Sequence, residues 1–186
     1  MTRLPRTLRL DPSDTVVFDR AAEPGEWAVP GGFAFWDEDP ATLTGRRRQA
    51  FRAGFLGLGS FGWSTLVEIA EAAPCECAQA VEALAARILA EHGAPSPDAA
   101  RAAAEEEIAF AESLCDHHPP GTVLALTRSV EEGGTVRERF RTLHRRDGPL
   151  ADRDRLPVFR LVEVEGEDEP PQHPDLTTLD RAGQGR

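Results

Sequence analysis

Apolar and polar positions along the chain follow two different periods, which predict strands toward both ends of the sequence and helices in its middle. In residues 75–92 and 97–115, apolar side chains recur every three or four positions, as on the buried face of a helix. Segments with alternating or β-branched apolar residues predict strands. These segments are 6–10, 15–18, 27–36, 63–70, 122–131, 135–143 and 157–164. This order predicts an α+β fold, in which one mostly antiparallel sheet carries about three helices on one face.

Residues 45–72 change from helical to strand character around a group of glycines, and they hold the densest aromatic cluster of the chain. Phe51, Phe55 and Leu58 follow the i, i+4, i+7 spacing of one helix face. Each internal glycine costs a helix about 1 kcal/mol relative to alanine, so the helix is expected to end near Leu58. A strand is then expected to begin at Trp63.

The same glycines match a dinucleotide-binding spacing, G-x-G-x-x-G, at Gly57, Gly59 and Gly62. That motif binds a pyrophosphate only when a strand precedes it and a helix follows it. Here the expected order is reversed, with a helix before the glycines and a strand after them. We therefore interpret the three glycines as residues that permit a sharp turn and close backbone packing.

Length and hydropathy indicate a single domain without a membrane span. The chain has 186 residues, and the domain is expected to cover residues 1–164. Residues 165–186 lack an apolar pattern and are predicted to form a mobile acidic and polar tail. Because no apolar run of about 18 residues occurs and the N-terminus has no secretion-signal pattern, we expect a cytoplasmic protein.

The charge of the chain disfavours nucleic acid as a ligand. The formal net charge is −11, whereas nucleic-acid binding generally needs an electropositive surface. The 21 basic residues are all arginines, and they concentrate in residues 137–160, while acidic residues concentrate in residues 68–116. Three cysteines in a cytoplasmic setting predict free thiols rather than disulfides.

Two short Cys/His clusters are the candidate metal site. They comprise Cys75 and Cys77 at the start of the first long helix, and Cys115 and His117 at the end of the second. Thiolate and imidazole ligands suit zinc, and antiparallel helices would bring these two ends together. The alternative is that Cys115 is a small core residue and that the histidine favourably faces a helix C-terminus.

An arginine stripe is the candidate binding site for an anion or an acidic partner. Arg137, Arg139 and Arg141 alternate along one predicted strand and share a face, which Arg145 would extend. Guanidinium groups bind phosphates and carboxylates through paired hydrogen bonds. The alternative is a solvated sheet face, or surface pairing with the acidic residues 105–107.

No catalytic residue is predicted. Glu105, Glu106 and Glu107 are consecutive on a helix, so their carboxylates point in different directions and are expected to be solvated. No serine lies in a G-x-S-x-G turn, and no motif relates a histidine to a nucleophile.

Four segments together resemble a family of small bacterial proteins known only as a domain of unknown function. The segments are RTLRLDPSDTVVFDRAAEPGEWAVPGGFAF, RQAFRAGFLGLGSFGWSTLV, AAEEEIAFAESLC and RERFRTLHRRDG, and the resemblance covers roughly residues 3–165. Such proteins look like companions of molybdenum-dependent, formate-dehydrogenase-like enzymes and of a biotin/lipoate-ligase-like protein. The resemblance implies an accessory role in maturation or assembly.

These patterns favour a non-enzymatic accessory protein that binds a protein partner. The features that suggest contact surfaces are the arginine stripe, the acidic helices, and Trp27 and Trp36, which are expected to be exposed. The alternative is a small protein that binds a metal through the Cys/His set or an anion through the arginine face.

Overall fold

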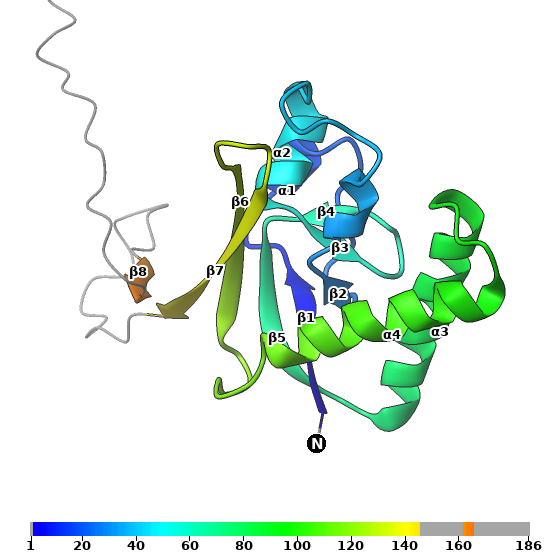
Figure 1. The fold of residues 1–186 in the computed structure, drawn as a ribbon. Helices are drawn as coiled ribbons and strands as arrows, with labels where there is room; N and C mark the ends of the chain where they lie inside the picture. The colour runs from blue at the N-terminus through cyan, green and yellow to red at the C-terminus, as the bar shows by residue number, and fades with distance from the viewer. Residues whose placement is uncertain (1, 146–161, 166–186) are drawn as a thin grey trace, which may run out of the picture.

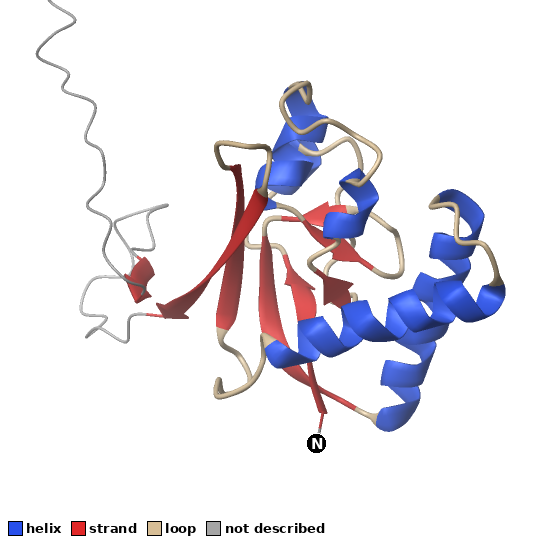
Figure 2. Cartoon of the chain, viewed as in Figure 1, coloured by secondary structure: helices blue, strands red, loops and turns tan. Residues whose placement is uncertain are grey.

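The computed structural model describes residues 2–145 and 162–165 of the chain, which form helices and two small sheets (Figures 1 and 2). The helices are α1 (Ser13–Val17), the 3₁₀ helix η1 (Gly32–Phe35), α2 (Gly45–Ala53), α3 (Pro74–Glu91) and α4 (Pro97–Ser113). The strands are β1 (Thr2–Leu8), β2 (Ala28–Val29), β3 (Phe55–Gly57), β4 (Trp63–Ser64), β5 (Leu66–Ala72), β6 (Val123–Val130), β7 (Val136–Arg145) and β8 (Val162–Glu165).

The strands pair antiparallel in both sheets, which confirms the predicted α+β class. The larger sheet has the order β1-β5-β6-β7-β8, and the smaller has the order β2-β3-β4. One sheet was expected, whereas the strands form two. The turn between β6 and β7 contains Gly133 and Gly134, both with positive φ, as predicted for this hairpin.

The two long helices are close to their predicted bounds. The Ser96 side chain accepts a hydrogen bond from the Ala99 N–H and so caps α4, and Gly93 ends the preceding helix with a φ of 68°. Both helices lie on one side of the larger sheet (Figure 1). Alanines and isoleucines on their facing sides are buried in one core cluster, which also includes Leu4 of β1.

The predicted strand at 15–18 is wrong, because this segment forms most of the one-turn helix α1. The turn places Asp14 inside the protein, where it is only 4% exposed. Its carboxylate accepts hydrogen bonds from the Thr65 hydroxyl at 2.6 Å and the Thr65 N–H at 3.2 Å, and from the Ser64 hydroxyl at 3.2 Å. An extended strand at 15–18 would not keep these hydrogen bonds to the Asp14 carboxylate.

The predicted strands at 27–36 and 63–70 are each divided. The first becomes β2 and then η1, because Gly31 has a φ of 72° and turns the chain after Pro30. The second becomes β4 and β5, which belong to different sheets. Similarly, the helix expected to reach Leu58 already ends at Ala53, and Phe55 lies in β3.

Within the described residues, no helix has the length and apolar character that a membrane span requires. Of the predicted strand at 157–164, residues 162–164 lie in β8, which pairs with the end of β7. Residues 157–161 and most of the predicted tail, 166–186, lie outside the described residues.

Candidate functional site

Arg128 is a buried cation that joins four separate parts of the fold. Its residue exposure is 2%, and its Nε donates to the Glu138 carboxylate at 2.5 Å across the β6–β7 ladder. One Nη atom donates to the carbonyls of Phe51 at 3.0 Å and Gly54 at 3.2 Å, where α2 ends. The other Nη atom donates to the carbonyl of Pro30. The side chain therefore satisfies otherwise unpaired carbonyls where α2, the segment before η1 and the sheet meet.

A second carboxylate lies beside this arginine. Glu107 of α4 accepts a hydrogen bond from the Gly31 N–H at 2.9 Å. Burial raises the pKa of Glu107 above its usual value, and Arg128 and the Gly31 N–H partly oppose that rise. A Cβ on Gly32 would lie 3.2 Å from the Glu138 carboxylate, so both glutamates adjoin the Pro30-Gly31-Gly32 turn. The expectation that all three consecutive glutamates are solvated is therefore wrong for Glu107.

Aromatic side chains extend this cluster toward the surface. Phe110 lies one helical turn after Glu107 on α4 and is 40% exposed. Its ring packs edge-on against Phe140, with 5.8 Å between the ring centroids. Phe140 is two residues from Glu138 on β7 and therefore shares its face of the sheet. The two carboxylates and two phenyl rings thus form one continuous region.

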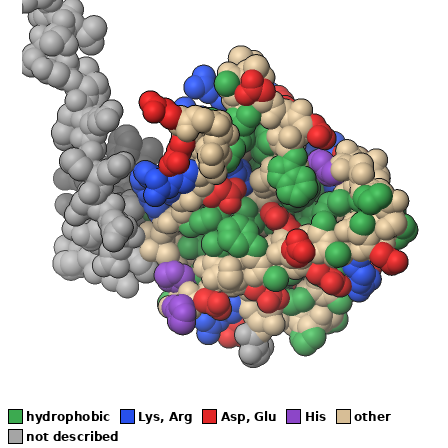
Figure 3. Space-filling model, viewed as in Figure 1, with side chains coloured by type: hydrophobic (Ala, Val, Ile, Leu, Met, Phe, Trp, Pro, Cys, Tyr) green, Lys and Arg blue, Asp and Glu red, His purple; other side chains and the backbone are tan. Residues whose placement is uncertain are grey.

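Trp36 lies at the C-terminal end of η1, four residues after the Gly32 that adjoins Glu138. It follows the helix that begins at Gly32 and is 81% exposed, the highest value among the exposed large apolar residues of the described chain. We call Trp36, Glu107, Phe110, Glu138 and Phe140 the aromatic–acidic surface. Figure 3 shows a face of the molecule on which apolar and acidic side chains lie intermingled.

Trp36 projects from a rigid support. Phe35, the residue before it, is buried against Trp63 with 5.2 Å between ring centroids. The Arg47 guanidinium lies over the same Phe35 ring, 4.2 Å from its centroid, and donates to the Ala34 carbonyl at 2.7 Å and to the Glu38 carboxylate. These contacts hold the backbone on both sides of the indole.

The other tryptophan that was expected to be exposed, Trp27, is half-buried. It packs against the core, and the Arg6 guanidinium lies 5.6 Å from the centre of its ring. Of the two predicted contact tryptophans, only Trp36 is therefore available at the surface.

The G-x-G-x-x-G loop does bind a carboxylate, and that carboxylate belongs to the same chain. One oxygen of Glu26 accepts hydrogen bonds from the N–H groups of Gly59 at 2.9 Å and Ser60 at 2.8 Å. A Cβ on Gly57 would lie 2.5 Å from that oxygen. Glu26 thus takes the place that a ligand phosphate has in nucleotide-binding loops. This arrangement supports the interpretation of the glycines as packing residues.

The predicted metal ligands belong to no ligand group among the described residues. Burial raises the pKa of Cys115 to about 12, and its thiol donates to the Ala111 carbonyl at 3.5 Å. Burial also raises the pKa of Cys77, and Glu112 contributes to the raised pKa of both thiols. Cys75 and His117 are exposed.

Among residues 2–145 and 162–165, no group of three or more Cys, His, Asp or Glu side chains could hold a metal ion. α3 and α4 pack against each other, and the buried Cys115 lies in a hydrophobic cluster as a core residue. The geometry gives the zinc hypothesis no support, and we assign no metal site.

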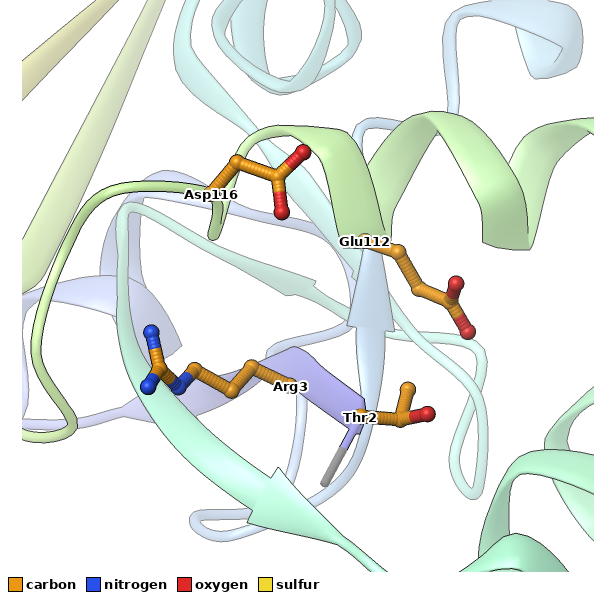
Figure 4. Close-up of a pocket in the computed structure, with 4 residues that line it drawn as sticks. All are labelled: Thr2, Arg3, Glu112 and Asp116. Atoms are coloured by element: carbon orange, nitrogen blue, oxygen red, sulfur yellow. The ribbon is translucent and has the colours of Figure 1, made fainter.

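A small pocket of about 130 Å³ lies between the start of β1 and the end of α4 and is lined by Thr2, Arg3, Glu112 and Asp116 (Figure 4). Its one guanidinium, on Arg3, already donates to the His118 carbonyl at 2.9 Å. The two carboxylates and the guanidinium give the pocket mixed charge, and nothing in it selects one class of ligand.

The arginine stripe lies on the opposite face of β7 from Phe140 and Glu138. Arg137, Arg139 and Arg141 pair in register with Ser129, Thr127 and Ala125, as residues on one sheet face should. Arg137 forms an ion pair with Glu131 at 3.0 Å, and Glu105 pairs with Arg101 instead of the stripe. Arg145 is the last residue of β7, and its side chain lies outside the described part. Anion or partner binding by these arginines stays a prediction.

Sequence reasoning missed Arg128 and Glu138, although the strand pattern contains a signal for both. Arg128 is two and four residues after the buried Leu126 and Leu124, so its side chain must lie on the apolar face of β6. A charge on such a face requires a partner. Because the hairpin turn sets the register, that partner could have been sought opposite it on β7.

Because burial raises the pKa of Glu107 in the folded protein, the free energy of unfolding is expected to depend on pH. In the pH range between its unfolded and folded pKa, the native state binds a proton that the unfolded state has lost, so the free energy of unfolding falls as pH rises. We expect Glu107→Gln, whose amide oxygen can still accept from Gly31, to be increasingly stabilised relative to the wild type as pH rises above about 4.5. Urea unfolding from pH 4 to pH 7 measures this difference. Glu106→Gln, at the exposed neighbour, should show no such trend, and an equal trend in both variants would contradict the prediction.

Comparison with known proteins shows the family of the chain. A family model described as a family of unknown function (DUF6505) matches residues 1–154. No curated protein and no solved structure matches the chain. The match spans most of the chain and includes every element that builds the aromatic–acidic surface, so the chain belongs to the DUF6505 family.

Proposed function

We propose that this protein is a non-enzymatic cytoplasmic accessory protein that binds a protein partner through its aromatic–acidic surface. The observation that carries the proposal is the exposure of Trp36, 81% of whose surface is open to solvent on a rigid support. Folding gains nothing from an exposed indole, whereas burial of a tryptophan at an interface often contributes several kcal/mol to binding.

The surroundings of Trp36 agree with an interface. Phe110 adds a second partly exposed ring, while Phe140 supports it from the sheet. Because Phe35 and Arg47 already fix the backbone beside the indole, binding would cost little additional ordering. A preformed aromatic anchor rimmed by polar groups is typical of protein-binding surfaces.

The resemblance of the sequence to companions of molybdenum-dependent, formate-dehydrogenase-like enzymes makes an enzyme of that kind the first partner to test. The accessory role would be one in maturation or assembly. A second candidate function, binding of an anion or an acidic partner by Arg137, Arg139 and Arg141, is favoured by their common sheet face.

The proposal predicts that Trp36→Ala abolishes capture of a stoichiometric partner from native lysate of the source organism. The variant removes the anchor without disturbing the core, so its melting temperature should match that of the wild type. The captured protein is then purified and titrated by calorimetry, where the substitution should weaken binding at least tenfold, or about 1.4 kcal/mol.

Two controls make the result specific. Leu10→Ala changes another exposed large apolar side chain, in the turn after β1, and should leave capture unchanged. A charge reversal at Arg137 and Arg141 tests the opposite face of β7. If wild-type protein recovers no stoichiometric partner, the proposed function is wrong; if only the charge reversal abolishes capture, the arginine face is the binding site instead.

A further inference from the structure

The acidic residues beside Trp36 indicate what the indole binds. The chain continues from Trp36 as Asp37-Glu38-Asp39, and Asp37 and Asp39 are exposed. Glu38 differs from its neighbours because it is half-buried and paired with Arg47. One exposed indole is therefore followed within three residues by two carboxylates at the surface.

Neither Arg47 nor Arg87 forms an ion pair with these carboxylates. Arg47 is engaged by Glu38 and by the Ala34 carbonyl. Arg87 pairs with Glu91 at 2.5 Å and lies over the Phe61 ring. Among the ion pairs of residues 2–145, none includes Asp37 or Asp39. Asp39 accepts a hydrogen bond from the Ala41 N–H at 2.9 Å, and both carboxylates are exposed to solvent.

His92, the titratable group whose pKa Asp37 also influences, supplies no positive charge to these carboxylates. His92, at the C-terminal end of α3, packs edge-on against Phe33 with 5.1 Å between ring centroids. Burial, and then Arg87, lower the pKa of His92, so the ring is neutral at pH 7 and supplies no compensating charge. Glu107 and Glu138 are already engaged, by the Gly31 N–H and by Arg128 respectively.

We propose that the partner is recognised through an arginine-bearing segment, whose guanidinium stacks on Trp36 while Asp37 and Asp39 bind it electrostatically. This inference rests on the proposed function and names the chemistry of the partner. A guanidinium is attracted to the face of an indole and to carboxylates at once, and it is weakly hydrated, so it loses little on burial. The net charge of −11 also favours encounter with a basic partner.

Two labelled nonapeptides test the recognition chemistry directly. One contains three Arg-Leu-Gly repeats, and the other has citrulline in place of each arginine, which keeps the planar group and removes its charge. Fluorescence anisotropy with the full chain should show binding of the arginine peptide at least tenfold tighter than binding of the citrulline peptide. Raising the salt concentration from about 50 mM to about 300 mM should weaken the binding, because exposed charges are then screened.

Variants locate the site on the protein. Trp36→Ala and the double variant Asp37→Asn with Asp39→Asn should each weaken binding of the arginine peptide at least fivefold. Asp98→Asn with Glu106→Gln removes two exposed charges from α4 and is the matched control, with unchanged binding expected. Equal binding of the citrulline peptide, or binding of the arginine peptide that is unaffected by Trp36→Ala, would overturn the inference.

The two experiments separate an error in the arginine-recognition inference from an error in the proposed partner binding. If lysate capture depends on Trp36 while the arginine peptide does not bind, the protein has a partner that is not basic at this contact. If sedimentation shows self-association that Trp36→Ala abolishes, the occupant of the surface is a second copy of the chain, and the inference of a separate arginine-bearing partner is wrong.

Discussion

Replacing Arg128 with methionine is expected to lower the free energy of unfolding by about 3–5 kcal/mol, as is found when one partner of a buried ion pair is removed. The substitution keeps much of the side-chain volume and removes every hydrogen bond that the guanidinium donates. The Glu138 carboxylate then lacks its cation, and the carbonyls of Pro30, Phe51 and Gly54 lose their donors inside the protein. Chemical denaturation followed by far-UV circular dichroism measures the loss.

Two comparisons separate this effect from a general effect of losing an arginine. Arg137→Met removes an arginine from the neighbouring strand, where its pair with Glu131 is exposed, and should cost less than about 1 kcal/mol. The double variant Arg128→Met with Glu138→Met should recover part of the loss, since no unpaired carboxylate remains. A cost for Arg128→Met as small as that for Arg137→Met would contradict the assigned role.

The periodic parts of the fold could be predicted from the sequence, because local pattern determines them. The long helices α3 and α4 have both an apolar stripe and end signals, such as Ser96 before α4 and Gly93 after α3. The β6–β7 hairpin has two apolar strands and a Gly133-Gly134 turn. In these elements, intrinsic propensity, capping and burial all favour the same conformation. Tertiary contacts therefore do not change the structure that the local sequence favours.

The segments predicted incorrectly are those whose conformation depends on distant residues. α1 is a single turn that brings Asp14 to Ser64 and Thr65, fifty residues away. The end of α2 coincides with the carbonyls that Arg128 binds from β6. No local window contains both members of such a pair, so short-range patterns could not identify them.

The candidate site was predictable only in part for the same reason. Trp36 was correctly expected to be exposed, whereas Trp27, expected to be exposed as well, is half-buried. Glu107 could not be separated from Glu105 and Glu106 without the position of Gly31, which lies 76 residues away along the chain. The surface is assembled from η1, α4 and β7, and its chemistry follows from that assembly.

Gly62→Ala is expected to destabilise the protein by about 3 kcal/mol, at the upper end of the usual cost of overpacking. A Cβ at this position would lie 2.5 Å from both the carbonyl carbon and the oxygen of Ala21. That backbone cannot move aside freely, because the Ala22 N–H donates to the Trp63 carbonyl at 2.9 Å and the Trp63 N–H donates to the Arg20 carbonyl at 2.8 Å. Relief of the clash would break hydrogen bonds on both sides of the contact. Chemical denaturation again measures the loss.

The matched control is Gly59→Ala in the same G-x-G-x-x-G loop. Its Cβ would approach the Glu26 side chain at 3.2 Å, and a side chain can shift where a backbone cannot, so a cost of about 1 kcal/mol is expected. If the glycines served a nucleotide phosphate instead of packing, neither substitution would greatly change the stability of the free protein. A small, equal effect of both on unfolding would therefore contradict the packing role, whereas a large effect at Gly62 alone would show that the loop needs glycine there for its close contact with Ala21.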